Sequence, residues 1–154
     1  MQIIPLILDK ESQSFDIYNK LVYNKNNIKF KNGDLLIISS KYLSISEGRI
    51  KKLENVKPNT YSIELSKLYH INPKLMELIV RESDEIFGGM YGFVLTSVHG
   101  ILSPNAGIDK SNIPSGMVVL YPKDPYNSIE TIRKKIFIDH LLIIIGLGVL
   151  FFWE

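Results

Sequence analysis

The spacing of hydrophobic residues alternates along the chain between the period of a helix and the runs of a strand. Apolar residues three and four positions apart predict four helices, over about 14–22, 60–69, 73–83 and 128–137. Ser14 is the predicted cap of the first helix. Asn72-Pro73 predicts the start of the third, because Asn caps a helix and Pro suits its first turn.

Strand signals fall between these helices and towards both ends of the chain. Leu35-Leu36-Ile37-Ile38 is a continuous apolar run after the turn signal Asn32-Gly33-Asp34, which is typical of a strand buried on both faces. Further strands are predicted over 2–8, 49–56, 93–98 and 117–121, the first as an edge strand because it contains Pro5. Gly88-Gly89 and Gly92 are expected to break the chain before 93–98.

This order of elements lacks strict strand–helix alternation, which favours an α+β fold: a mixed sheet with flanking helices. The 154 residues, 45% hydrophobic and 22% charged, suit an ordinary globular domain with its own core. Neither GxGxxG nor GxxxxGK[ST] occurs, which excludes a Rossmann fingerprint and a P-loop.

The net charge of +2 is too small to argue for nucleic acid or an anionic membrane as a partner. The basic run Arg133-Lys134-Lys135 suits the C-terminal end of a helix. The absence of cysteine excludes disulfides, zinc ribbons and thiol nucleophiles, and fits a reducing compartment. Because the N-terminus also lacks the pattern of a signal peptide, we expect a cytoplasmic protein.

The C-terminal run from Leu141 to Trp153 is entirely apolar residues and glycine. A membrane span needs about 20 apolar residues, so we favour a buried strand over a membrane anchor. We therefore expect one domain over 2–145, followed by an aberrant apolar tail over 146–154.

The segment from His99 to Pro114 reads as a long polar loop and is the first candidate for chemistry. The carboxylate of Asp109, the hydroxyl of Ser111 and the amides of Asn105 and Asn112 suit a hard cation such as magnesium or manganese. The same residue types also suit a turn-rich loop whose side chains bond their own backbone. Both interpretations stay open at this point.

Two other segments are weaker candidates. In Ser44 to Arg49, Gly48 permits close backbone approach, and Arg49 can bind phosphate through two hydrogen bonds. The alternative interpretation of this segment is an ordinary turn with a surface ion pair. Ser39-Ser40-Lys41 reads as a polar loop after a strand, a common place for ligands. His70 is expected to be solvated near a helix end, and no spacing resembles a zinc site.

Several of these segments together resemble the coenzyme F-420-0:L-glutamate ligase family. The resemblance covers about Gln2 to Ile145, and the run NAGIDKSN, Asn105 to Asn112, is its most specific part. The other matching segments are Ile4 to Ile7, Gly33 to Lys41, Ser44 with Glu47-Gly48-Arg49, His99-Gly100, and Pro122 to Pro125.

The resemblance implies the unusual α+β fold of that family and a ligase that is found largely in archaea and actinobacteria. Such an enzyme attaches L-glutamate to a deazaflavin coenzyme precursor, with GTP as substrate and a divalent metal, Mn²⁺ or Mg²⁺. The resemblance places Asp109 at the metal and implies a homodimer, but it assigns no catalytic residue. The GTP site would be lined by Ile4, Pro5, Leu6, Ile7, Ser39, Ser40 and Asn112.

The chain departs from the family pattern at two places. The family has Lys where this chain has Ile45, and an Asp-Thr pair followed by FGR where this chain has Gly146 to Glu154. Three hypotheses follow. The chain is an active ligase, with the rest of the site supplied by a complementing second half; or a nucleotide-binding relic without turnover; or a binding module tethered to a membrane.

Overall fold

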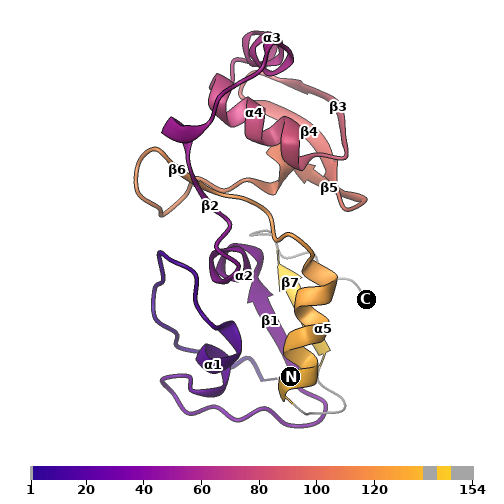
Figure 1. The fold of residues 1–154 in the computed structure, drawn as a ribbon. Coiled ribbons are helices and arrows are strands. Elements are labelled where there is room, and N and C mark those ends of the chain that lie inside the picture. The colour runs from indigo at the N-terminus through magenta and orange to yellow at the C-terminus, as the bar shows by residue number, and fades with distance from the viewer. Residues whose placement is uncertain (1, 137–141, 147–154) are drawn as a thin grey trace. The chain divides into compact units, whose positions relative to one another are not determined.

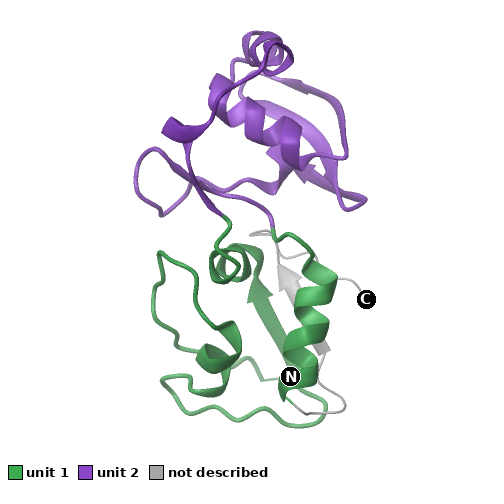
Figure 2. Ribbon diagram, in the orientation of Figure 1, with its two compact units in different colours: residues 1–49, 122–154 green, residues 50–121 purple. Residues whose placement is uncertain are grey.

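The chain folds into two compact units in the computed structural model, which describes residues 2–136 and 142–146 (Figure 1). Unit 1 comprises residues 1–49 and 122–154, and unit 2 comprises residues 50–121 (Figure 2). The predicted α+β class is confirmed, since helices accompany three small sheets. Parallel and antiparallel pairs occupy separate sheets.

Unit 1 is built on a parallel strand pair. β1 (Leu35–Ser39) pairs with β7 (Leu142–Gly146), with Leu35 opposite Leu142 and Ser39 opposite Gly146. The helices of this unit are α1 (Ile17–Val22), α2 (Ser40–Ser46) and α5 (Pro125–Ile136).

The core of unit 1 joins one face of β1 to all three helices. Its fully buried members are Leu21, Leu36, Ile38, Leu43 and Ile132, and each such side chain contributes on the order of 2 kcal/mol. Leu6, Leu8 and Phe30 pack at its margin. The prediction that β1 is buried on both faces is wrong, because Leu35 and Ile37 remain 48% and 50% exposed.

Unit 2 combines a pair of helices with an antiparallel sheet. α3 (Thr60–Tyr69) and α4 (Pro73–Glu82) precede the sheet of β3 (Glu85–Met90), β4 (Phe93–Val98) and β5 (Ile101–Pro104), in which β4 is central. A separate antiparallel pair joins β2 (Ile50–Lys52) to β6 (Met117–Val119). The short 3₁₀ turns are η1 (Leu53–Asn55) and η2 (Asn105–Gly107).

Helix prediction was most accurate in unit 2. The 60–69 helix is confirmed, and α4 begins as Asn72-Pro73 predicts, with the Asn72 side chain accepting from the N–H groups of Lys74 and Leu75. The predicted break at Gly88-Gly89 is wrong, because both residues lie within β3. A Cβ on Gly89 would stand 2.3 Å from the Phe93 carbonyl oxygen, so this glycine serves close strand approach.

Several boundaries in unit 1 differ from the predictions. Residues 2–8 form no strand. Asp16, rather than Ser14, caps α1 by accepting from the Asn19 N–H. Ser40 begins a helix where a polar loop was predicted, and α5 begins at Pro125, before the predicted Ser128.

The structure describes part of the apolar C-terminal run from Leu141 to Trp153. The predicted strand after Leu141 is present as β7, while residues 147–154 lie outside the described part of the chain. Among the described residues, no helix has both the length and the hydropathy that a membrane crossing requires.

Candidate functional site

The predicted N-terminal part of the nucleotide site, Ile4 to Ile7, is an irregular segment pinned by one side chain. Asn26 Nδ2 donates to the Pro5 carbonyl at 2.7 Å, and Asn26 Oδ1 accepts from the Ile7 N–H at 3.1 Å. The Ile7 carbonyl accepts from the Lys25 N–H at 3.1 Å. These bonds replace the strand ladder that was predicted, and they leave Ile4 and Ile7 about half exposed.

Charged groups anchor the chain just beyond this segment. The Asp9 carboxylate lies 2.6 Å from the Lys25 ammonium and 3.5 Å from that of Lys20. The Lys25 ammonium lowers the pKa of Asp9, while the Glu11 carboxylate, 2.5 Å away, raises the pKa of Lys20. All these groups are solvent-accessible, so we assign the network to the placement of the segment rather than to proton transfer.

Ser39 and Ser40 lie where β1 passes directly into α2. Ser39 is exposed and caps α2 with its backbone, but its hydroxyl makes no capping hydrogen bond. Ser40 is buried at the first position of the helix. At the carboxyl end of the strand, Ser39 is thus exposed to solvent and Ser40 is not.

The NAG part of the predicted metal loop, Asn105 to Gly107, is a left-handed turn. Asn105, Ala106 and Gly107 have φ angles of 49°, 56° and 66° in succession. Non-glycine residues adopt this conformation only when their surroundings enforce it. Here Asn105 Oδ1 accepts from the Val94 N–H at 3.0 Å, and Thr96 Oγ1 accepts from the Ala106 N–H at 3.0 Å.

Asp109 follows this turn and is held by its backbone. Its N–H and carbonyl each form a 2.9 Å hydrogen bond with Val119, which makes an isolated antiparallel bridge. Its Oδ1 accepts from the Ser111 N–H at 2.6 Å, so the turn interpretation of this loop is correct for one carboxylate oxygen. Asn112, also left-handed with a φ of 51°, is exposed.

The donor set around Asp109 is small. Within residues 2–136 and 142–146, no group of three or more His, Asp or Glu side chains is placed to hold a metal ion. One carboxylate suffices for Mg²⁺ only when phosphate and water supply most of the remaining ligands. The chemistry of a single Asp109 carboxylate is thus compatible with a metal ion that arrives bound to a nucleotide.

The predicted residues divide between the two units. Ile4 to Ile7, Ser39 and Ser40 belong to unit 1, whereas Asp109 and Asn112 belong to unit 2. Ile45, where the family pattern has Lys, is buried in unit 1 with 6% exposure.

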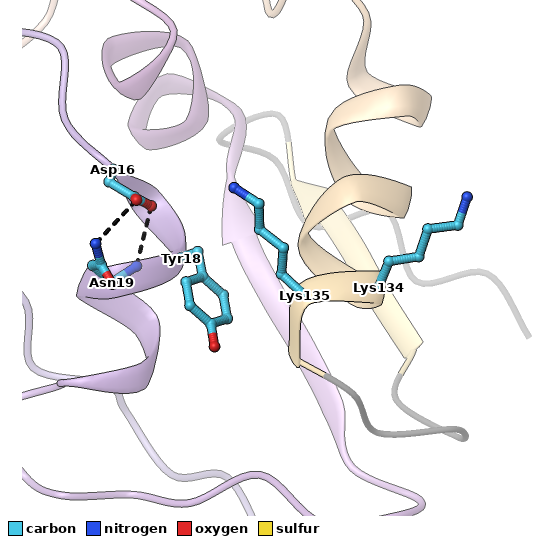
Figure 3. Close-up of a pocket in the computed structure, with 5 residues that line it drawn as sticks. All are labelled: Asp16, Tyr18, Asn19, Lys134 and Lys135. Atoms are coloured by element: carbon cyan, nitrogen blue, oxygen red, sulfur yellow. Dashed lines mark hydrogen bonds between the residues drawn. The ribbon is translucent and has the colours of Figure 1, made fainter.

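A groove of about 620 Å³ lies elsewhere, between α1 and α5. It is lined by Asp16, Tyr18, Asn19, Lys134 and Lys135, none of which was predicted as a site residue. Lys135 extends towards Tyr18, 5.9 Å from the ring centroid, while Lys134 points to the other side of α5 (Figure 3). The Asp16 carboxylate already accepts from Asn19, so the groove offers little unengaged polar surface and we assign it no ligand.

Sequence reasoning missed the connecting role of Glu47. Its carboxylate accepts from the Lys123 N–H at 2.9 Å and from the Ser128 hydroxyl at 2.6 Å. In the sequence, Glu47-Gly48 and Pro122 to Pro125 both belong to the segments that resemble the family. This membership alone does not indicate that the two segments are in contact.

Residues 4–145 match the family described as F420-0:Gamma-glutamyl ligase. The chain is similar to the coenzyme F420:L-glutamate ligase of Methanopyrus kandleri, with 28% identity over 88% of this chain and 54% of the relative. It is also similar to the enzyme of that name from Methanocaldococcus jannaschii, with 36% identity over 69% of this chain and 43% of the relative.

A third relative, the coenzyme F420:L-glutamate ligase of Methanothermobacter thermautotrophicus, is 34% identical over 68% of this chain and 42% of its own length. The chain thus spans about half the length of the curated relatives it matches.

Proposed function

The chain belongs to the F420-0:Gamma-glutamyl ligase family, and we propose that it acts in attaching L-glutamate to the deazaflavin precursor of coenzyme F-420, with GTP and a divalent metal. The observation that carries the proposal is the family match over residues 4–145, which contains every residue predicted for the site. The names of the relatives support the same reaction.

We assign the GTP-facing role in unit 1 to Ile4 to Ile7 and to the Ser39-Ser40 junction. The exposed Ser39 hydroxyl makes no capping bond, so it can turn towards an incoming polar group. Ser40, which is buried, would act by fixing the start of α2 rather than by contact.

In unit 2 we assign Asp109 to the metal and Asn112 to the nucleotide. A divalent ion bound there would offset negative charge on phosphate oxygens. Asp109 supplies one carboxylate, and its backbone is hydrogen-bonded to Val119. The left-handed turn that precedes it sets the direction in which the chain enters this loop. Ligation would transfer the γ-phosphoryl group of GTP to a carboxylate of the precursor, with GDP as leaving group. The glutamate amine would then attack the acyl phosphate and form the amide, with loss of a proton and release of inorganic phosphate, so the reaction depends chiefly on positioning and on charge neutralisation.

The test is mass spectrometry of the chain after incubation with GTP, Mn²⁺, L-glutamate and the glutamate-free coenzyme. A product heavier by one glutamyl unit, absent with Asp109→Asn, supports the proposal. A full-length relative serves as positive control.

A second candidate function is nucleotide binding without turnover, favoured by Ile45, which is buried at the position where the family pattern has Lys. Binding of GTP with no product would support it. Product formed only after adding the remaining half of a relative would instead indicate a complementing second polypeptide, and a concentration-dependent product would support the proposed homodimer.

A further inference from the structure

Unit 2 is an insertion in unit 1. The chain leaves unit 1 after Arg49 and returns to it at Pro122 (Figure 2). We call residues 47–52 and 117–123 together the neck. The neck thus contains one outgoing and one returning segment.

On the unit 2 side, the two neck segments are joined by backbone pairing. Ile50 lies opposite Val119 and Lys52 opposite Met117 in the β2–β6 ladder. The Leu53 N–H then donates to the Gly116 carbonyl at 2.8 Å. A three-residue antiparallel pair is marginal by itself, since isolated two-stranded pairs are barely stable in water.

On the unit 1 side, a side chain joins them. Glu47 accepts through Oε2 from the Lys123 N–H and through Oε1 from the Ser128 hydroxyl, so its two bonds span 76 and 81 residues. One carboxylate oxygen is therefore engaged by Lys123 of the returning segment, and the other by Ser128 in α5, which follows that segment. Hydrogen bonds to an ionised acceptor are stronger than neutral ones.

The backbone around Glu47 orients its side chain towards Lys123 and Ser128. The Glu47 N–H donates to the Leu43 carbonyl, and the Arg49 N–H donates to that of Ser44 at 2.9 Å, which closes the end of α2. Gly48, with a φ of 70°, makes the reversal that a side chain would strain. Ser128 lies in the first turn of the 12-residue α5, where the helix dipole favours a negative charge.

We propose that Glu47 is a clasp that holds the outgoing and returning segments of the neck together, so that both open as one cooperative element. β2–β6 pairing joins the two segments within unit 2, and the Glu47 carboxylate joins them within unit 1. This inference goes beyond the proposed ligase activity and does not depend on it.

Limited trypsin digestion of the full chain tests the clasp, because Arg49 lies on the outgoing segment and Lys123 on the returning one. Cleavage of a native protein follows the population of locally open states when opening is fast. Glu47→Ala is expected to speed cleavage after both residues together, by at least about tenfold, because it removes both hydrogen bonds to the ionised carboxylate. Cleavage after Lys67, on α3, should be unchanged.

Two further variants make the test specific. Ser128→Ala removes one of the two contacts and is expected to speed both neck cleavages by a smaller factor. Glu54→Ala removes a neighbouring exposed carboxylate, which pairs with Lys52 at 3.8 Å, and should leave cleavage after Lys123 at the parent rate.

The proposal is overturned if Glu47→Ala leaves both neck cleavages unchanged, or speeds cleavage after Arg49 alone, because the segments then open independently. If cleavage after Lys67 rises equally, the variant is globally destabilised and Ser128→Ala decides. A joint rise at the two neck sites in Ser128→Ala then supports the clasp, and no rise there overturns it. Faster hydrogen exchange of the Lys123 amide is the matching direct readout.

Discussion

Replacing Glu77 is expected to destabilise unit 2 more than any replacement of an exposed carboxylate. Glu77 lies in α4 and is 3% exposed. It accepts from the Asn59 backbone N–H at 2.8 Å and from Arg81 Nε at 2.6 Å. Asn59 is the cap of α3, so this one carboxylate ties the start of α3 to α4.

The magnitude follows from these contacts. Hydrogen bonds to a charged group contribute about 1.5–3 kcal/mol, but Arg81 is 55% exposed and regains water when its partner is removed. Glu77→Ala should therefore cost about 2–3 kcal/mol, chiefly from the bond with Asn59. Glu77→Gln keeps one acceptor oxygen and should cost about 1 kcal/mol.

The pH dependence has a defined sign. The Asn59 N–H chiefly, with smaller contributions that include Arg81, holds the pKa of Glu77 below its ordinary value of 4.5. The folded state therefore binds fewer protons than the unfolded state, so this contribution is complete above pH 4.5 and is lost as the pH falls through the folded pKa. The stability difference between the parent and Glu77→Gln should shrink over that range.

Native-state hydrogen exchange of α3 and α4 amides is the suitable assay, because it reports on unit 2 without assuming that the whole chain unfolds in one step. Glu64→Ala, on the exposed side of α3, is the matched control. Equal losses in Glu77→Ala and Glu64→Ala, or a parent–Gln difference independent of pH, would refute the reasoning.

Three other substitutions have expected outcomes. Asn72→Ala should lower the free energy of unfolding by about 1 kcal/mol in urea titrations, because it removes the cap of α4, and Asn72→Ser should restore most of it. Gly89→Ala should cost about 1–3 kcal/mol through contact with the Phe93 carbonyl, whereas Met90→Ala, at a 70% exposed position of the same strand, should change stability by under about 0.5 kcal/mol. Asp109→Asn should retain the acceptor for the Ser111 N–H and an unchanged circular dichroism spectrum, yet weaken Mg²⁺-dependent GTP binding by about tenfold or more in calorimetric titration.

Local signals in the sequence were sufficient at several places where a residue acts on its immediate neighbours, although not at the start of α1, which Asp16 caps in place of Ser14. Asn72-Pro73 specified the start of α4 because a cap and its N–H partners lie within three residues. The apolar run at 35–38 specified a strand. Asp109 and Ser111 were correctly expected to be able to form a turn, because an Asx turn needs only two further residues.

The sequence failed where the partner is distant along the chain. The 2–8 segment has the composition of a strand, but Asn26 takes the Pro5 and Ile7 backbone groups that a strand would use. Gly88-Gly89 resembled a break, and only the neighbouring β4 shows that Gly89 is required for close approach. The exposure of Leu35 and Ile37 depends on what covers each face of β1, which periodicity does not encode.

The same division applies to the candidate site. The sequence alone indicated the family, because the order and spacing of NAGIDKSN and its companion segments resemble the family pattern, and the family match over residues 4–145 confirms it. The tertiary structure decided that Ser39 is exposed and Ser40 buried, that Ala106 is held left-handed by Thr96, and that Glu47 reaches Lys123. Contacts between residues tens of positions apart are set by how whole elements pack, and the energy of that packing is not carried by any short segment.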